Sequence, residues 1–168
     1  MPTVRASRTI AAPAAELWEL VCDPYHLPRW WPRVTRVEQV DEDGFTEVMK
    51  TRKGKTVRAD FAISERDGEQ RRLRWQQRIE GTPFAGVLQS SETELTLREL
   101  AGGGRTLTEV TIELRQELSA GVDPAWAKLP GSRLARAVKP AGVAARMVRR
   151  AATGTIEEAL SGLERISV

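Results

Sequence analysis

The chain has 168 residues, with 26 basic and 23 acidic side chains, a formal net charge of +3, one His and one Cys. This length favours a single domain over residues 1–168, and one Cys and one His can form neither an internal disulfide nor a Cys/His zinc site. No stretch approaches the roughly 18 consecutive apolar residues of a membrane helix. Residues 1–12 lack the apolar core of a signal peptide, so we expect a cytoplasmic protein.

The N-terminal segment predicts a strand followed by short helical elements. Residues 3–12 alternate apolar and polar side chains, which is typical of a half-buried strand. Pro13 then favours the start of a helix, because the first residue of a helix needs no N–H donor. Pro24 ends that helix, because the residue before a proline avoids the helical conformation. Residues 25–32 are aromatic and bounded by proline, and we expect one helical turn or an ordered loop there.

From Arg33 to Leu118 the hydrophobic pattern has period two and predicts six further strands. Short connections that contain glycine separate these segments and are typical of antiparallel neighbours. Several segments alternate apolar side chains with Arg or Glu, so we expect one face of the sheet to be covered and the other to meet water. The predicted strands span residues 33–42, 44–53, 55–66, 70–80, 84–99 and 104–118.

The covering element is predicted to be a long helix over about residues 140–165. Apolar side chains recur there at a spacing of three and four residues from Ala144 to Leu163, and charged side chains occupy the opposite side. The predicted fold is therefore α+β. A curved, seven-stranded antiparallel sheet grips a long C-terminal helix, with two short helices between strands 1 and 2.

Four segments near the N-terminus resemble the opening of START-like helix-grip proteins of the SRPBCC superfamily, many of which are called polyketide cyclases/dehydrases. They are Ala12-Pro13, Leu17-Trp18-Glu19-Leu20-Val21, Asp23 and Leu27-Pro28-Arg29-Trp30-Trp31-Pro32. The order of predicted elements agrees with this family along the whole chain. The resemblance implies a seven-stranded sheet around a C-terminal helix, with a cavity for an apolar ligand between them.

The resemblance leaves the chemistry open, because the family includes lipid carriers, hormone receptors, aromatases/cyclases and stress proteins. Our first hypothesis is that the protein binds a hydrophobic small molecule in that cavity, namely a lipid, an isoprenoid or an aromatic polyketide. The second hypothesis is a polyketide cyclase or aromatase. The third is a peripheral lipid carrier that docks on an anionic membrane surface.

Residues 84–99 carry a run of polar side chains on one face of a predicted strand. Gln89, Ser91 and Thr93 alternate in this run, and a solid core rarely accepts such a series, because buried polar groups need partners. The alternatives are mutual hydrogen bonds or exposure at a frayed end, whereas a cavity with a polar stripe would use these groups to orient a ligand. The predicted wall residues are Phe61, Trp75, Gln77, Gln89, Ser91 and Met147, with Trp30 and Trp31 at the entrance.

A cyclase also needs a proton carrier within reach of a bound carbonyl group. His26 is the only His, and it lies in the proline-bounded segment that would border the cavity mouth. Glu47 is the second candidate, because it shares the parity of Phe45 and Met49 and would point inward. The alternatives are an exposed or capping role for His26, and a bulge or edge position that lets Glu47 reach water.

The lipid-carrier hypothesis depends on residues 126–150, which begin with Trp126 and carry seven basic and no acidic side chains between Lys128 and Arg150. Interfacial segments combine such residue types, and the alternative is a solvated connection with Trp126 packed inward. Nucleic-acid binding is not expected, because the aromatic residues mostly alternate into the core instead of lining a basic groove. No cofactor or metal is expected, and nothing in the sequence indicates an oligomeric state.

Overall fold

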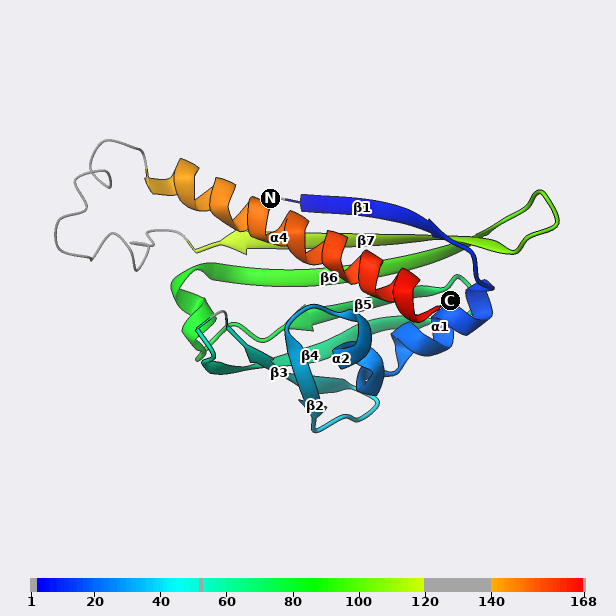
Figure 1. Ribbon diagram of the computed structural model, residues 1–168. Coiled ribbons are helices and arrows are strands. Elements are labelled where there is room, and N and C mark those ends of the chain that lie inside the picture. The colour runs from blue at the N-terminus through cyan, green and yellow to red at the C-terminus, as the bar shows by residue number, and fades with distance from the viewer. Residues whose placement is uncertain (1–2, 52, 120–139, 168) are drawn as a thin grey trace.

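The computed structural model describes residues 3–51, 53–119 and 140–167, with only the backbone described in residues 140–144 (Figure 1). The described strands form one antiparallel sheet in the order β1-β7-β6-β5-β4-β3-β2, so the first and last strands are neighbours and β1 and β2 are the edges. The strands are β1 (Thr3–Ile10), β2 (Val34–Glu38), β3 (Gly44–Lys50), β4 (Thr56–Asp67), β5 (Arg72–Gln77), β6 (Leu88–Leu100) and β7 (Leu107–Leu118).

The helices cover the inner face of this sheet. Between β1 and β2 lie α1 (Ala14–Cys22), the 3-10 helix η1 (Pro24–His26) and α2 (Leu27–Trp30). The long helix α4 (Pro140–Ile166) runs across the sheet, and its C-terminal end reaches the side where α1 and α2 lie (Figure 1). This arrangement confirms the predicted α+β helix-grip fold. Among the described residues, no helix is both long and apolar enough to cross a membrane.

Strand β5 illustrates why the period-two segments form this sheet. Leu73 and Trp75 are buried in the core, whereas Arg72 and Arg74 alternate with them on the opposite face. Arg74 Nη2 lies 2.6 Å from a carboxylate oxygen of Glu94 on β6, within a larger group of ion pairs. On this strand the outer face is therefore charged and the inner face apolar from Leu73 to Trp75, as the alternation predicted.

The structure differs from the sequence prediction at residues 84–87, which do not belong to a strand. The 3-10 helix η2 (Pro83–Gly86) occupies this position. Pro83 suits the start of a helix because its ring fixes φ, and Thr82 Oγ1 accepts a hydrogen bond from the Phe84 N–H at 3.3 Å. These two local preferences end the period-two pattern before β6.

A β-bulge at the start of β6 changes which side chains face the interior. The register with β7 shifts between Leu88 and Ser90, so that one residue is extra on β6. Leu88 and Ser91 are both buried, and Gln89 between them is exposed. The prediction that Gln89 points inward is therefore wrong, because the bulge breaks the strict alternation on which it rested.

The two halves of α4 present side chains of different size to the sheet. Toward the C-terminal end, Leu160 and Leu163 are fully buried against the core. Before the midpoint of the helix, the smaller side chains of Ala151 and Ala152 line the space beneath the sheet. Sheet and helix are therefore closely packed at one end of α4, and open space remains between them at the other.

Candidate functional site

The open space is a pocket of about 530 Å³ between the inner face of the sheet and α4, here called the sheet–helix pocket. Strands β3 to β7, η2, α4 and the residue that follows α2 contribute its walls. Most of the side chains that line it are apolar, which is typical of a site for a hydrophobic ligand. They include Trp31, Met49, Phe61, Trp75, Leu114 and Val148.

Aromatic side chains form one wall of the sheet–helix pocket. The ring centroids of Trp31 and Trp75 lie 5.8 Å apart, with their planes at 70°. Phe45 also lies edge-on to Trp75 at 5.8 Å, and Phe61 stacks on Phe45 at 5.2 Å. Because these are favourable geometries for aromatic pairs, the rings support one another and present a preformed apolar surface.

A band of polar side chains crosses the inner face of the sheet beside this wall. Gln77 on β5, Ser91 on β6 and Gln116 on β7 all line the pocket, and Ser91 lies opposite Gln116 in register. Gln116 Nε2 donates a hydrogen bond to Ser91 Oγ at 3.4 Å. The side-chain amide of Gln77 makes no hydrogen bond within the described residues, so it is free to bind a polar group of a ligand.

Glu47 is the only ionisable side chain among the described residues that line the sheet–helix pocket. It lies on β3, is 2% exposed and forms no hydrogen bond or ion pair with any described residue. Burial disfavours its charged form and raises the pKa of the carboxyl from 4.5 to about 8. At neutral pH Glu47 is therefore mostly protonated, and it can donate a hydrogen bond to a ligand oxygen or exchange a proton.

The structure does not bring His26 into this pocket. His26 lies on η1, where its Nε2 is 3.7 Å from Asp23 Oδ2 and its Nδ1 is 3.3 Å from Arg29 Nη1. About one third of the side chain is exposed, and it is not among the residues that line the sheet–helix pocket. Its side chain makes no capping hydrogen bond, so its position is the partly exposed one, and the arrangement offers no route from its ring to a ligand in the pocket.

The two tryptophans expected at an entrance differ in position. Trp31 lines the sheet–helix pocket, whereas Trp30 is 2% exposed and belongs to the core between α2 and α4. Met147, which was expected in the wall, is 57% exposed and does not line the pocket. Helix α4 is rotated so that Val148 and Ala152 face the sheet instead.

Six of the predicted site residues meet around the sheet–helix pocket. They are Trp31, Glu47, Phe61, Trp75, Gln77 and Ser91. Sequence reasoning missed Gln116, although extending the alternation of Ile112 and Leu114 by two residues would have placed it inward. It also missed Thr155, which the rotation of α4 brings to the wall and which no strand pattern indicates.

Metal and thiol chemistry find little support in the described part of the chain. No group of three or more His, Cys, Asp or Glu side chains there is arranged to hold a metal ion. Burial raises the pKa of the Cys22 thiol to about 11, so this residue carries little of the thiolate that a nucleophile needs. Residues 126–139 of the basic stretch lie outside the described residues, and membrane docking through residues 126–150 stays a prediction.

Solved structures with the same fold cover nearly the whole chain. The Zhui aromatase/cyclase from Streptomyces sp. R1128 has 17% sequence identity and a TM-score of 0.70, over 99% of this chain and 93% of that one. A START superfamily protein from Mycobacterium smegmatis has 15% identity and a TM-score of 0.67, over 98% and 96%. The protein TTHA0849 from Thermus thermophilus has 24% identity and a TM-score of 0.66, over 98% and 95%. At these identities the likeness establishes the fold alone.

The sequence itself matches a family profile over almost its full length. Among proteins with curated functions, none matches this sequence closely enough to count as a relative. The profile described as "Polyketide cyclase / dehydrase and lipid transport" matches residues 1–167. Together with the helix-grip fold, this match shows that the chain belongs to the polyketide cyclase/dehydrase and lipid transport family.

Proposed function

We propose that the protein binds a hydrophobic small molecule in the sheet–helix pocket, a lipid, an isoprenoid or an aromatic polyketide that carries an oxygen acceptor. The family description and the START and aromatase/cyclase neighbours support this class of ligand. The volume of about 530 Å³ lies within the range of small-molecule sites. Trp31, Phe61 and Trp75 would contact its apolar body.

The observation that carries the proposal is the state of Glu47. Its buried carboxyl has no partner among the described residues, and it faces a mostly apolar pocket. A buried polar group left without a hydrogen bond costs about 1–3 kcal/mol. A ligand that presents a carbonyl or hydroxyl oxygen to Glu47 would remove this cost, and the free amide of Gln77 offers a second polar contact.

Two probes of nearly equal shape test this role. Anthraquinone and anthracene share a flat tricyclic frame, but only anthraquinone has carbonyl oxygens. We expect anthraquinone to bind at least tenfold more tightly, which corresponds to about 1.4 kcal/mol, as measured by quenching of the tryptophan fluorescence. In Glu47→Met, which keeps a similar volume without the carboxyl, most of this preference should be lost.

The controls follow from the same comparison. Equal affinity of the two probes for the wild-type protein, or an undiminished preference in a folded Glu47→Met variant, would contradict the role of Glu47. Binding of neither probe would contradict the pocket assignment. Native mass spectrometry of protein purified gently from its own host would then identify the chemical class of the natural ligand.

A second candidate function, cyclisation of a polyketide chain, is favoured by the raised pKa of Glu47. The carboxyl of Glu47 titrates near pH 8, so part of it is ionised at neutral pH. The carboxylate can take a proton from a carbon that lies between two carbonyl groups of the chain. The enolate carbon then attacks a second carbonyl of the same chain, and the resulting alkoxide takes the proton back from Glu47. The reaction needs no oxidant or reductant, because a C–C bond forms and the proton is returned.

Glu47→Gln separates cyclisation from binding. Glutamine keeps a hydrogen-bond donor at this position but transfers no proton, so a cyclase would keep its ligand affinity and lose turnover of a poly-β-ketone by about 10²-fold or more. His26→Gln is the matched control, because His26 lies outside the pocket. Unchanged turnover in Glu47→Gln would exclude Glu47 as the proton carrier.

A further inference from the structure

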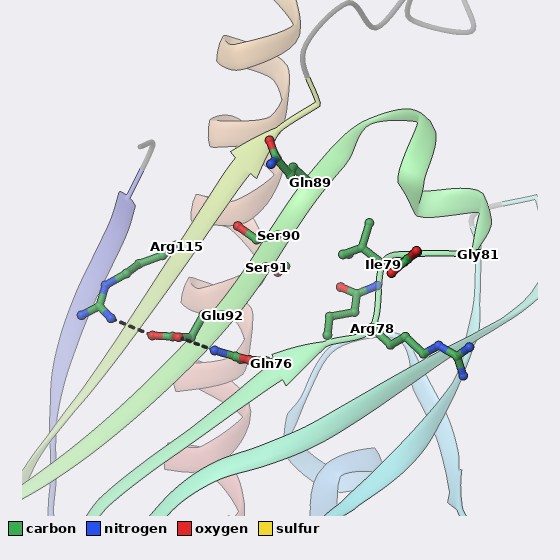
Figure 2. A pocket seen from close by; sticks show the side chains of 11 residues that line it. Gln76, Arg78, Ile79, Gly81, Gln89, Ser90, Ser91, Glu92 and Arg115 are labelled. Atoms are coloured by element: carbon green, nitrogen blue, oxygen red, sulfur yellow. Dashed lines mark hydrogen bonds and ion pairs between the residues drawn. The ribbon is translucent and has the colours of Figure 1, made fainter.

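Strands β5 and β6 separate at one end of the sheet. Their pairing ends at Gln76 and Glu92. After this point the chain from β5 continues along β4, because the Arg78 N–H donates to the Asp60 carbonyl at 2.8 Å. The start of β6 instead follows β7, with which Ser90 is paired. The sheet therefore forms a fork between β5 and β6, and Figure 2 shows the two strands diverging there.

The fork contains a groove of about 1070 Å³, here called the seam groove. Gln89 and Ser90 on β6 line one side of it, and Ile79 and Gly81 line the other (Figure 2). Beyond this opening η2 joins the two strands, and it is held to the end of β7 by the Ser119 N–H, which donates to the Val87 carbonyl at 3.0 Å. The groove therefore lies between the start of β6 on one side and the chain that follows β5 on the other.

A chain of hydrogen bonds marks the closed end of the seam groove. Gln76 Nε2 donates to one carboxylate oxygen of Glu92 at 3.0 Å, and Arg115 Nη1 donates to the other at 2.7 Å (Figure 2). These three side chains tie β5, β6 and β7 together on the outer face of the sheet. They fix the point at which the fork begins.

Two side chains line both the seam groove and the sheet–helix pocket, namely Gln77 and Ser91. They stand at the point where the two strands part and β5–β6 pairing has ended. Elsewhere a continuous hydrogen-bonded sheet separates the inner face from the outer face. Gln77 and Ser91 line both spaces, so the groove and the pocket lie next to each other where the two strands part.

The charges of the seam groove indicate what it can bind. Among the described lining residues, Arg78 and Arg115 are cationic, and Glu80 and Glu92 are anionic. Arg115 and Glu92 already neutralise each other at 2.7 Å. The two positive and two negative side chains cancel, so the groove favours neither an anionic nor a cationic ligand. The remaining polar side chains are amides and hydroxyls, which suit a neutral head that both donates and accepts hydrogen bonds.

We infer that the ligand is an amphiphile whose apolar body occupies the sheet–helix pocket and whose neutral, hydroxyl- or amide-bearing head lies in the seam groove. The chain between them passes Gln77 and Ser91, whose side chains contact the junction of head and body. The inference rests on the proposed function for the apolar body. It adds a head-group site on the outer side of the sheet and excludes a ligand that is enclosed entirely between the sheet and α4.

Two probes distinguish the head-group site from the pocket. Dodecyl maltoside, used below its micelle concentration, has a neutral polyhydroxyl head, and 1-dodecanol has the same chain without it. We expect both to shift the backbone amide NMR signals of Trp75 and Thr93 in the pocket. Only dodecyl maltoside should shift those of Gly81, Gln89 and Ser90 in the groove. Pocket shifts without groove shifts would overturn the head-group site alone, and no pocket shifts with either probe would overturn the proposed function as well.

A bulky side chain in the groove provides the second arm of the test. Ser90 lines the seam groove but not the pocket. Ser90→Trp should therefore lower the affinity for dodecyl maltoside at least tenfold and leave the affinity for 1-dodecanol unchanged. If Ser90→Trp does not fold, Gln89→Trp replaces it. Gln89 is an exposed residue of the same groove, and its replacement by Trp should lower the affinity for dodecyl maltoside in the same way. Arg98→Trp is the matched control, because Arg98 is an exposed residue of β6 outside the groove. Unchanged maltoside affinity in both folded groove variants would overturn the inference.

Discussion

Gly162 on α4 lies directly against the main chain of Trp30, since a Cβ at position 162 would stand 2.3 Å from the Trp30 carbonyl oxygen. This contact brings α4 and α2 together at backbone distance. Trp31 follows Trp30 in the chain and lines the sheet–helix pocket. The missing side chain at position 162 therefore helps to set how far α4 stands from the aromatic wall of the pocket.

Gly162→Ala is expected to destabilise the protein by about 1–3 kcal/mol, because the added methyl group meets rigid backbone and must displace α4 or α2. Gly154→Ala is the matched control on the same helix, because nothing lies within 4 Å of a Cβ built there. That change should stabilise the protein by up to about 1 kcal/mol through helix propensity. Denaturant unfolding measures both, and a Gly162→Ala variant as stable as Gly154→Ala would contradict the close contact.

Much of the fold was predictable because it follows from local periodicity. The period-two pattern of β5 placed Leu73 and Trp75 on the covered face and Arg74 on the outer face, as observed. The glycine-bearing connections predicted antiparallel neighbours, and the apolar stripe of α4 predicted the covering helix. Each of these inferences depends on residues a few positions apart, so it needs no knowledge of distant contacts.

Parts of the candidate site depended on features that periodicity does not contain. The bulge between Leu88 and Ser90 reverses the orientation of Gln89, and a one-residue shift moves a side chain to the opposite face of a sheet. Met147 belongs to the apolar stripe, but the rotation of α4 is set by its packing on β1, β7 and α2 and leaves Met147 exposed. The fork beside Gln77 likewise arises from long-range strand pairing.

Glu47 is expected to make the stability of the protein depend on pH. Its carboxyl has a pKa of about 8 in the folded protein and near 4.5 in the unfolded chain, so the folded state binds the proton more tightly. The free energy of unfolding should therefore fall as the pH rises from about 4.5 to 8, by a few kcal/mol, and then level off. Denaturant unfolding of the wild type and Glu47→Gln at several pH values measures this contribution as their difference.

Other carboxyl groups contribute to both proteins equally, so only the difference between them reports on Glu47. This difference should favour the wild type most below pH 4.5 and least above pH 8. A difference that stays constant over this range would show that Glu47 does not keep its proton in the folded state.

The same titration should control ligand binding. Protonated Glu47 donates to a carbonyl oxygen, whereas its carboxylate would repel that oxygen. Between about pH 7 and 9.5 we expect the affinity for anthraquinone to fall tenfold or more, because the carboxyl loses its proton near pH 8. Glu47→Gln should bind with no such dependence, since its amide does not titrate. A pH-independent wild-type affinity would contradict donation by Glu47.

His26 is expected to have little influence on ligand binding. It lies outside the sheet–helix pocket and contacts Asp23 and Arg29 at a partly exposed position. His26→Gln should leave the affinity for anthraquinone within twofold of the wild type and change the free energy of unfolding by at most about 1 kcal/mol, as for other partly exposed polar contacts. A large loss of affinity in a folded variant would mean that η1 moves toward the pocket when ligand binds.

Filling the pocket from α4 should separate binding from folding. Ala152 is buried and lines the sheet–helix pocket, so Ala152→Leu would place its added methyl groups in open space. We expect at least a tenfold loss of anthraquinone affinity and no loss of stability, because overpacking costs energy only where the space is already filled. Met147→Leu is the matched control, since it puts the same side chain on an exposed position of α4 five residues earlier and should leave the affinity unchanged. If Ala152→Leu bound the probe as well as Met147→Leu, the ligand would have to lie elsewhere than between α4 and the sheet.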